Sequence, residues 1–361
     1  EIRLYNPFRV RTWGTLGAAV DFLLASYRLN HRMHNKAWIA DGRLFVGGGR
    51  NIGDEYFDAA KQFNFRDLDV VVEGRAAAQA VAEFDRYWHS VRVRPLKALA
   101  AAAAVRKRAD RLSGLDELRR RLEAAAAGQA GAEYLARSAA GPDLAALLAD
   151  GRELVPEDRV RIAADPPRKG LGRRRAPGML AEVRSAIGAA RREVFIASPY
   201  FVPGRRGAKL LASLVRRGVR VVVVTNSLAA TDVLAVHGGY ARRRRRLLRA
   251  GVELRELKRG GQEGASLLGS GGHASLHTKA FCVDGEVAFV GSFNFDPRSA
   301  HLNTEMGVFL RHAAVAERLR GEIERLSDPA RSWAVRLDAA GRLAWEDGSP
   351  GGPVHGEPGT T

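Results

Sequence analysis

Residues 34–51 read HNKAWIADGRLFVGGGRN, and residues 277–294 read HTKAFCVDGEVAFVGSFN. Four polar positions of the first stretch recur in the second at one interval, which for the histidine is 277 − 34 = 243 residues. The paired positions are His34 and His277, Lys36 and Lys279, Asp41 and Asp284, and Asn51 and Asn294. A repeat kept in register over this distance indicates a duplicated unit. We therefore expect two related lobes.

Each copy predicts a β-hairpin followed by a further strand. Apolar runs at 37–40 and 280–283 lead into Asp-Gly dipeptides, which favour the tight turn of a hairpin, and a second apolar run follows each turn. The next strand carries acids near its start, Asp67 and Asp69 in the first copy and Glu305 in the second. Because alternate residues of a strand share a face, each motif histidine points the same way as the lysine two positions further on.

Helices and strands alternate before the second copy. The sequence predicts a helix at 179–190, a strand at 193–197, and two buried strands at 219–224 and 252–257, of which the first is expected to be parallel. This alternation is typical of an α/β protein. The expected fold class is therefore α/β, with two pseudo-twofold-related lobes, each a mixed sheet flanked by helices, and an active site at the lobe interface.

The chain is expected to divide into four parts. They are a first lobe (1–95), a helical connector rich in arginine and alanine (96–178), a second lobe (179–340) and a flexible tail rich in glycine and proline (341–361). In the first lobe only the stretch 2–5 corresponds to the strands that open the second lobe. We therefore expect the first lobe to be truncated at its N-terminus, and a longer form to be more active.

The composition limits the class of binding partner to anionic molecules but does not select one of them. A chain of 361 residues with 58 Lys and Arg against 40 Asp and Glu carries a formal charge of +18. Such a charge attracts anionic partners, whether nucleic acid, an anionic lipid surface or a phosphorylated substrate. The single cysteine, Cys282, excludes an intramolecular disulfide and argues against a cysteine-based zinc site. Lysines within each motif would repel a cation, so neither a metal nor a cofactor is predicted.

The repeated residues suit chemistry at a phosphodiester. Histidine acts as a nucleophile or a general acid near neutral pH. A lysine brings positive charge to a phosphate oxygen, and an asparagine can donate hydrogen bonds to a phosphoryl group. If the two copies meet, one histidine can attack phosphorus while the other protonates the leaving alcohol and deprotonates the incoming one. The symmetry of the repeat leaves open which histidine attacks.

The repeated pattern His-x-Lys-x4-Asp-x6-Gly-Gly/Ser-x-Asn resembles the phospholipase D superfamily. Five further stretches resemble its bacterial cardiolipin synthase-like branch, namely FRDLD (65–69), FDRYW (84–88), SPYFVP (198–203), TNSL (225–228) and DPRS (296–299). The resemblance implies a metal-independent phosphatidyl transfer through a covalent phosphohistidine, in which phosphatidylglycerol or another phospholipid donor yields cardiolipin. It also implies an anionic phospholipid substrate and peripheral attachment to a bacterial cell membrane, on its cytoplasmic side.

The resemblance assigns a role to each repeated residue. It makes His34 the nucleophile and His277 the general acid and base. The expected phosphate ligands are Lys36, Lys279, Asn51, Asn294 and Ser292, the residues expected to orient the histidines are Asp69 and Glu305, and the acids expected to be structural are Asp41 and Asp284. Gly49 stands where the second copy has Ser292, so the two half-sites are expected to be chemically unequal.

Alternative functions remain open at this point. The same motif also serves phospholipid hydrolysis and nucleic-acid phosphodiesterases, and the positive charge suits DNA. No basic strand interleaved with aromatic residues offers base stacking, which counts against nucleic acid. A binding module without activity is a further alternative, against which the intact histidines and lysines argue. The arginine run 242–246 is interpreted as a solvated helix face or a patch that steers anionic lipid. The oligomeric state is not predicted.

Overall fold

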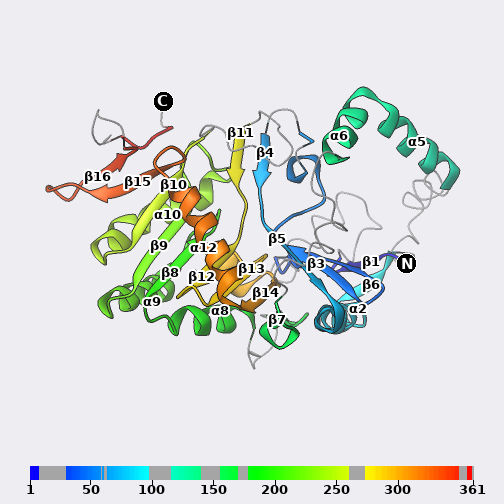
Figure 1. Cartoon of the computed structure of the whole chain (residues 1–361), viewed down its shortest axis with the longest axis horizontal. Helices are drawn as coiled ribbons and strands as arrows, with labels where there is room; N and C mark the ends of the chain where they lie inside the picture. The colour runs from blue at the N-terminus through cyan, green and yellow to red at the C-terminus, as the bar shows by residue number, and fades with distance from the viewer. Residues whose placement is uncertain are drawn as a thin grey trace, which may run out of the picture. The chain divides into compact units, whose positions relative to one another are not determined.

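The computed structural model describes residues 1–7, 30–57, 59–60, 63–96, 115–139, 155–169, 178–259, 273–348 and 356–359 (Figure 1). The described residues form two compact units. The smaller takes residues from Glu1–Arg32 and Asp85–Leu154, and the larger takes residues from Met33–Phe84, Val155–Gly264 and Gly271–Thr361. Both copies of the repeated motif therefore lie within the larger unit.

The smaller unit combines a pair of strands with two helices. β1 (Arg3–Tyr5) runs antiparallel to β6 (Val93–Pro95), and helices α5 (Leu115–Ala127) and α6 (Gln129–Ala139) follow along the chain. The connector expected at 96–178 is helical in α5 and α6. Its stretches at 97–114, 140–154 and 170–177 lie outside the described residues.

The described strands of the larger unit include a nine-stranded mixed sheet, in the order β16-β15-β10-β9-β8-β12-β13-β14-β7. In chain order these strands are β7 (Val160–Ala164), β8 (Glu193–Ala197), β9 (Arg220–Asn226), β10 (Glu253–Leu257), β12 (Ala280–Val283), β13 (Val287–Gly291), β14 (Met306–Arg311), β15 (Ser332–Leu337) and β16 (Leu343–Glu346). Strands β8, β9 and β10 are parallel to one another. The buried, valine-rich run at 219–224 predicts this for β9, because parallel strands are covered on both faces.

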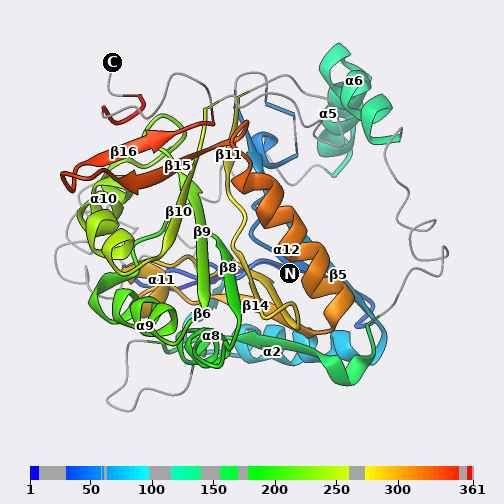
Figure 2. The same cartoon turned by 60° about the vertical axis from the view of Figure 1, so that its left-hand side comes forward.

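Helices cover both faces of this sheet. They are α8 (Met179–Gly188), α9 (Gly204–Arg216), α10 (Leu234–Arg249), α11 (Pro297–His301) and α12 (Ala313–Ser327). Figure 2 shows α12 on one side and α9 and α10 on the other. In β8, Val194 and Ile196 pack into the core under α8 and α9, whereas Phe195 and Ala197 pack into the core under α12. Alternate residues thus serve opposite faces, and the expected α/β class is confirmed.

The first copy of the motif builds the same hairpin as the second. β2 (Ala37–Ala40), β3 (Leu44–Gly48) and β5 (Asp69–Glu73) pair antiparallel in the order in which β12, β13 and β14 pair. Both turn residues of each hairpin have positive φ, +52° and +66° at Asp41-Gly42 and +56° and +66° at Asp284-Gly285. This backbone is that of the hairpin turn that Asp-Gly favours, so both predicted hairpins are confirmed.

Two strands lie in the segments predicted to be a helical connector and a flexible tail. β7 falls within the predicted helical connector, yet it pairs with β14 at one edge of the large sheet. Val160 and Ile162 are buried while Arg161 is exposed, which is the period-two pattern of a strand. β16 falls within the predicted flexible tail, yet it pairs with β15. The tail boundary at 341 is therefore too early.

The arginine run on α10 is not simply a solvated face. Arg244 is 1% exposed and forms ion pairs with Glu256, at 2.9 Å, and with Glu357. The hydroxyl of Tyr240, one turn earlier, donates to Glu256 at 2.9 Å. A buried arginine requires such partners, because an unpaired charge in the interior is costly. This part of α10 therefore belongs to the core of the larger unit.

Candidate active site

The histidine of the second copy follows a short strand that pairs with the first copy. β11 (His273–Leu276) runs parallel to β4 (Phe63–Arg66), with their last residues opposite each other. His277 and Asp67 are the next residues on the two strands, and the backbone N–H of His277 donates to the carbonyl of Arg66 at 2.7 Å. Nδ1 of His277 lies 2.6 Å from Oδ2 of Asp67. The acid that holds this histidine thus comes from the other copy.

The first copy repeats this arrangement with the partners exchanged. Met33 forms a parallel bridge with Thr304, and the backbone N–H of His34 donates to the carbonyl of Thr304 at 2.9 Å. The next residue on the second strand is Glu305, whose Oε2 lies 2.8 Å from Nδ1 of His34. The pairing is therefore crosswise, and the two copies together form a composite site.

The prediction that Asp69 orients a histidine is wrong. Oδ2 of Asp69 accepts a hydrogen bond from Nε of Arg50 at 2.6 Å, and Asp67 contacts His277 instead. The prediction for Glu305 agrees with its contact to His34. The distinction between the two aspartates matters, because a carboxylate fixes the tautomer of a histidine only when it bonds to the ring nitrogen.

The strand register explains why the sequence alone points to Asp69 instead of Asp67. Asp69 lies opposite Gly48 in the first copy, and Gly307 lies opposite Gly291 in the second. Since Gly48 and Gly291 occupy equivalent positions of the repeat, Asp69 corresponds to Gly307. The residue two positions before Asp69, which is Asp67, therefore corresponds to the residue two before Gly307. Only the strand pairing shows how many residues the loop of the first copy inserts.

Each motif lysine folds back onto its own histidine. Nζ of Lys36 donates to the backbone carbonyl of His34 at 2.9 Å, and Nζ of Lys279 donates to that of His277. Burial lowers the pKa of both lysines from 10.5 to about 8, although the two carboxylates that hold the histidines act in the opposite direction. Both lysines are therefore mainly protonated at neutral pH. They give the site two positive charges suited to a phosphate.

The two histidines lie in unequal surroundings. The side chain of His277 is 6% exposed and that of His34 is 26% exposed. The ring of His277 packs beside Phe65 and Tyr56, with centroid distances of 4.9 and 5.0 Å. Burial, aided by the charge of Lys279, lowers the pKa of His277 to about 4, against the opposing effect of Asp67. His277 is therefore neutral at pH 7 in the free protein.

Ser292 and Gly49 differ because their neighbouring acids differ. The hydroxyl of Ser292 donates to Oε2 of Glu305 at 2.6 Å, rather than lying free to donate to a phosphate as predicted. Burial acts to raise the pKa of Glu305, but hydrogen bonds from His34 and Ser292 bring it below its usual value. At Gly49 a Cβ would lie 2.6 Å from Oδ1 of Asp67. A serine there would displace the acid, so the predicted inequality of the half-sites has a steric cause.

The two asparagines lie at the same end of their hairpins as the histidines, since each follows the returning strand. Nδ2 of Asn51 donates to the hydroxyl of Tyr56 at 2.7 Å. Asn294 is 4% exposed, and its Oδ1 has no hydrogen-bond partner among the described residues. Tyr56 was not predicted as a site residue, because it lies in the loop that the second copy lacks.

Another pair of residues near the site was also missed. The hydroxyl of Tyr200 donates to Oδ2 of Asp232 at 2.6 Å, and the charge of Asp232 acts on Lys279. Burial raises the pKa of Tyr200, and the bond to Asp232 raises it further. The phenol therefore stays protonated and serves as a donor. The SPYFVP stretch marked this region, but neither residue has a counterpart in the repeat that would have identified it.

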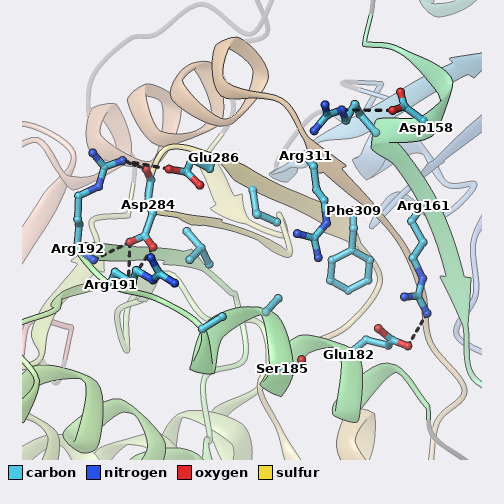
Figure 3. Close-up of a pocket in the computed structure, with 15 residues that line it drawn as sticks. Asp158, Arg161, Glu182, Ser185, Arg191, Arg192, Asp284, Glu286, Phe309 and Arg311 are labelled. Atoms are coloured by element: carbon cyan, nitrogen blue, oxygen red, sulfur yellow. Dashed lines mark hydrogen bonds and ion pairs between the residues drawn. The ribbon is translucent and has the colours of Figure 1, made fainter.

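The motif aspartates lie at the far end of the hairpins, away from the histidines. Asp284 accepts hydrogen bonds from the backbone N–H groups of Arg191 and Arg192, at 2.9 and 2.8 Å (Figure 3), and from that of Glu193 at 2.9 Å. These bonds lower the pKa of Asp284, although its partial burial acts to raise it. Asp41 occupies the equivalent turn. Both positions agree with the structural role predicted for these acids.

Neither a metal site nor a membrane-spanning helix is found among the residues that the structure describes. No group of three or more His, Cys, Asp or Glu side chains there is arranged to hold a metal ion. No helix in the described part of the chain has the length and apolar character that crossing a membrane requires.

Comparison with known proteins gives consistent matches. The family model described as "Cardiolipin synthase, PLD-like domain" matches residues 183–327. Cardiolipin synthase C of Escherichia coli (strain K12) is 40% identical over 357 residues, which are 96% of this chain and 72% of that protein. An uncharacterized protein of Helicobacter pylori is 30% identical and covers 98% of this chain, with 68% of its own length matched. A cardiolipin synthase of Halalkalibacterium halodurans is 27% identical over 81% of this chain and 45% of that protein.

Among solved structures, phosphatidylserine synthase of Haemophilus influenzae Rd KW20 matches with a TM-score of 0.52. It is 14% identical and covers 84% of this chain and 63% of its own, so the likeness concerns the fold. The duplicated hairpins and their crosswise site, taken together with these relatives, identify a phospholipase D-type phosphatidyltransferase. Within that class, the chain belongs to the cardiolipin synthase family.

Proposed function

We propose that this chain transfers a phosphatidyl group from phosphatidylglycerol, or another phospholipid donor, to the hydroxyl of a second phosphatidylglycerol, giving cardiolipin. The observation that carries the proposal is the crosswise pairing of His34 with Glu305 and of His277 with Asp67. A reaction in two displacements needs two histidines at one phosphorus atom, and this pairing brings them to one site. The relatives named cardiolipin synthase support the choice of substrate.

In the first displacement, Nε2 of His34 attacks phosphorus and a P–N bond forms. Glu305 accepts the hydrogen of Nδ1, which leaves the other ring nitrogen with a free lone pair. The P–O bond to the alcohol of the donor breaks, and the proton carried by His277 passes to the departing oxygen. The product is a covalent phosphatidyl-histidine and a neutral alcohol.

In the second displacement, the hydroxyl of the acceptor lipid enters. His277 takes its proton, the oxygen attacks phosphorus, and the P–N bond to His34 breaks. His277 regains the proton that it gave in the first step, so no proton is consumed over the cycle. In the free protein burial keeps the pKa of His277 at about 4. The negative charge of the bound phosphodiester favours the protonated form that an acid requires.

The motif lysines supply the positive charge that a metal ion supplies in other phosphoryl-transfer enzymes. The ammonium groups of Lys36 and Lys279 stabilise the phosphoryl oxygens as charge develops on them, and Asn51 and Asn294 donate further hydrogen bonds. The reaction is accordingly proposed to be independent of metal. A chain with a charge of +18 is proposed to act at the surface of a bacterial membrane, on its cytoplasmic side.

One assay tests substrate class and metal requirement together. Phosphatidylglycerol vesicles and, in parallel, single-stranded DNA are incubated with the protein in EDTA, and the products are measured by mass spectrometry. The expected result is cardiolipin with intact DNA. Phosphatidic acid in place of cardiolipin would assign hydrolysis instead of transfer. Cleaved DNA with unchanged lipid would contradict the proposed function and favour a nuclease, which the net charge also suits.

A further inference from the structure

A groove that no catalytic residue lines lies between α8, α9 and the loop after Asn294. Its volume is 230 Å³, and its lining is mainly aliphatic and aromatic. Leu180, Val202, Leu210 and Phe295 line it while being only partly buried. Apolar surface gathered in a concave site marks a place for an apolar ligand.

The groove adjoins the half-site of His34. The carbonyl of Ser292 lies 3.2 Å from Nδ1 of His34, and the same loop continues through Phe293 and Phe295 to Asp296, all three of which line the groove. The position of Asp296 is fixed, since it caps α11 by accepting from the backbone N–H of Ser299 at 2.8 Å. Phe295, its neighbour, is tied to the other wall, because the N–H of Val202 donates to the carbonyl of Phe295 at 2.7 Å. One wall of the groove and the catalytic loop are thus formed by the same continuous segment of the chain.

The charges around the groove suit an anionic lipid surface. Arg184, Arg205 and Arg206 line it and are exposed, against one acid, Asp296, among the described residues that line it. Juxtamembrane arginines are attracted to anionic headgroups. An apolar groove with arginines around it therefore fits the boundary between headgroups and acyl chains.

A second pocket on the other side of α8 provides the contrast (Figure 3). Its volume is 790 Å³, and several of its arginines are matched by acids, with Arg161 2.6 Å from Glu182 and Arg192 3.8 Å from Glu286. Those charges largely neutralise one another within the protein. The apolar groove instead combines apolar walls with arginines that form no ion pair with the residues the structure describes, and it borders the catalytic loop.

We propose that this groove holds an acyl chain of the anionic phospholipid that reacts at His34. The inference rests on the proposed function and deepens it, because it names the part of the substrate that the protein recognises besides the phosphate. Burying one methylene contributes about 0.8 kcal/mol, a factor of about four in binding. Substrates with longer acyl chains should therefore be favoured over short ones until the groove is full.

A matched pair of variants tests the groove. Leu210→Trp fills it from α9, and Leu248→Trp places the same bulk on α10, where Leu248 is also a half-buried leucine packed on the same core but lines another pocket. For each variant, kcat/KM is measured with dioleoyl and with dihexanoyl phosphatidylglycerol in mixed micelles. We expect the ratio of long-chain to short-chain kcat/KM to fall by about tenfold or more in Leu210→Trp. The ratio should stay at the wild-type value in Leu248→Trp.

An unchanged ratio in folded Leu210→Trp would overturn the inference while leaving the proposed function intact. A wild-type protein that turns over neither lipid would instead contradict the proposed function. A second measurement needs no variant and no turnover. Wild-type protein is irradiated with vesicles of phosphatidylethanolamine and a phosphatidylglycerol that carries a diazirine in one acyl chain, and labelled peptides are mapped. Labels on α8, α9 or Phe295 are expected, and labelling confined to other segments would refute the groove as the acyl-chain site.

Discussion

The two copies of the motif share a backbone but differ in what surrounds it. His34 is held by Glu305, which also accepts from Ser292, and its side chain is 26% exposed. His277 is held by Asp67 beside Gly49 and is 6% exposed. The duplication thus supplies equivalent positions, while the length of each acid and the loop of the first copy make the two imidazoles chemically different.

The largest expected effect separates the two histidines. His34→Ala and His277→Ala should each lower phosphatidyl transfer by about 10⁴-fold or more, because each removes a group that acts directly at phosphorus. With a phosphatidyl ester of p-nitrophenol, the first displacement needs no general acid, since the phenolate leaves unaided. His277→Ala should then release one equivalent of p-nitrophenol in a burst, and His34→Ala should release none.

The reverse pattern, with a burst in His34→Ala alone, would exchange the roles of the two histidines. Bursts in both variants would contradict the composite site, because each half would then react independently.

Substitution of Asp67 is expected to have the next largest effect, and substitution of Asp69 serves as its control. Asp67→Asn should lower kcat by about 10³-fold, because an amide cannot hold His277 in the same tautomer and charge state. Asp69→Asn alters an aspartate two positions away, bonded to a partly exposed arginine, Arg50, and should cost less than about tenfold. Steady-state kinetics at one pH compares the two variants. A larger loss in Asp69→Asn would restore the assignment that the sequence suggested.

Deprotonation of the two motif lysines is expected to reduce activity at alkaline pH. Burial lowers the pKa of Lys36 and Lys279 to about 8, so their charge is present below that pH and is lost above it. Binding of the phosphodiester requires that charge, and the diester itself does not titrate in this range. We therefore expect kcat/KM for dihexanoyl phosphatidylglycerol to fall about tenfold or more per pH unit above that pKa. A flat profile between about pH 7 and pH 10 would show that the lysine charges are not needed.

The smallest effects come from the positions that differ between copies. Gly49→Ser places its Cβ against Asp67 and should cost about tenfold in kcat, since the acid must move. Ser292→Ala removes one hydrogen bond to Glu305 and should cost a factor of about five. Both are measured at the pH of maximal activity. Equal and negligible effects would mean that the inequality of the half-sites has no part in catalysis.

Much of this arrangement could be predicted from the sequence, because local patterns determine it. The Asp-Gly turns, and the strands and helix before the second copy, follow from short-range propensity and periodicity, whereas the motif histidines and lysines lie just outside the strands in which they were expected. That Glu305 orients a histidine also follows from the resemblance, although only the structure shows that this histidine is His34. Each of these depends on a pattern within a few residues, or on a motif that is unambiguous.

Other features depend on long-range pairing that no local pattern encodes. Asp67 and Asp69 are both acids before a strand, and only the pairing of Asp69 with Gly48 shows which one reaches His277. The hydroxyl of Ser292 points to Glu305 because a neighbouring strand brings that acid there. The sequence does not predict β7, because the surrounding composition is rich in arginine and alanine and favours helix. Its role as an edge strand depends on its pairing with β14.

The central claim is that the two copies form one reacting site, and the number of covalent adducts per chain tests it most directly. Wild-type protein is mixed with excess phosphatidylglycerol, quenched during turnover in denaturant at mildly alkaline pH, which preserves a P–N bond, and examined by mass spectrometry as intact protein and as peptides. We predict at most one phosphatidyl group per chain, carried by His34. Two groups on one chain, with His34 and His277 both modified, would contradict the account.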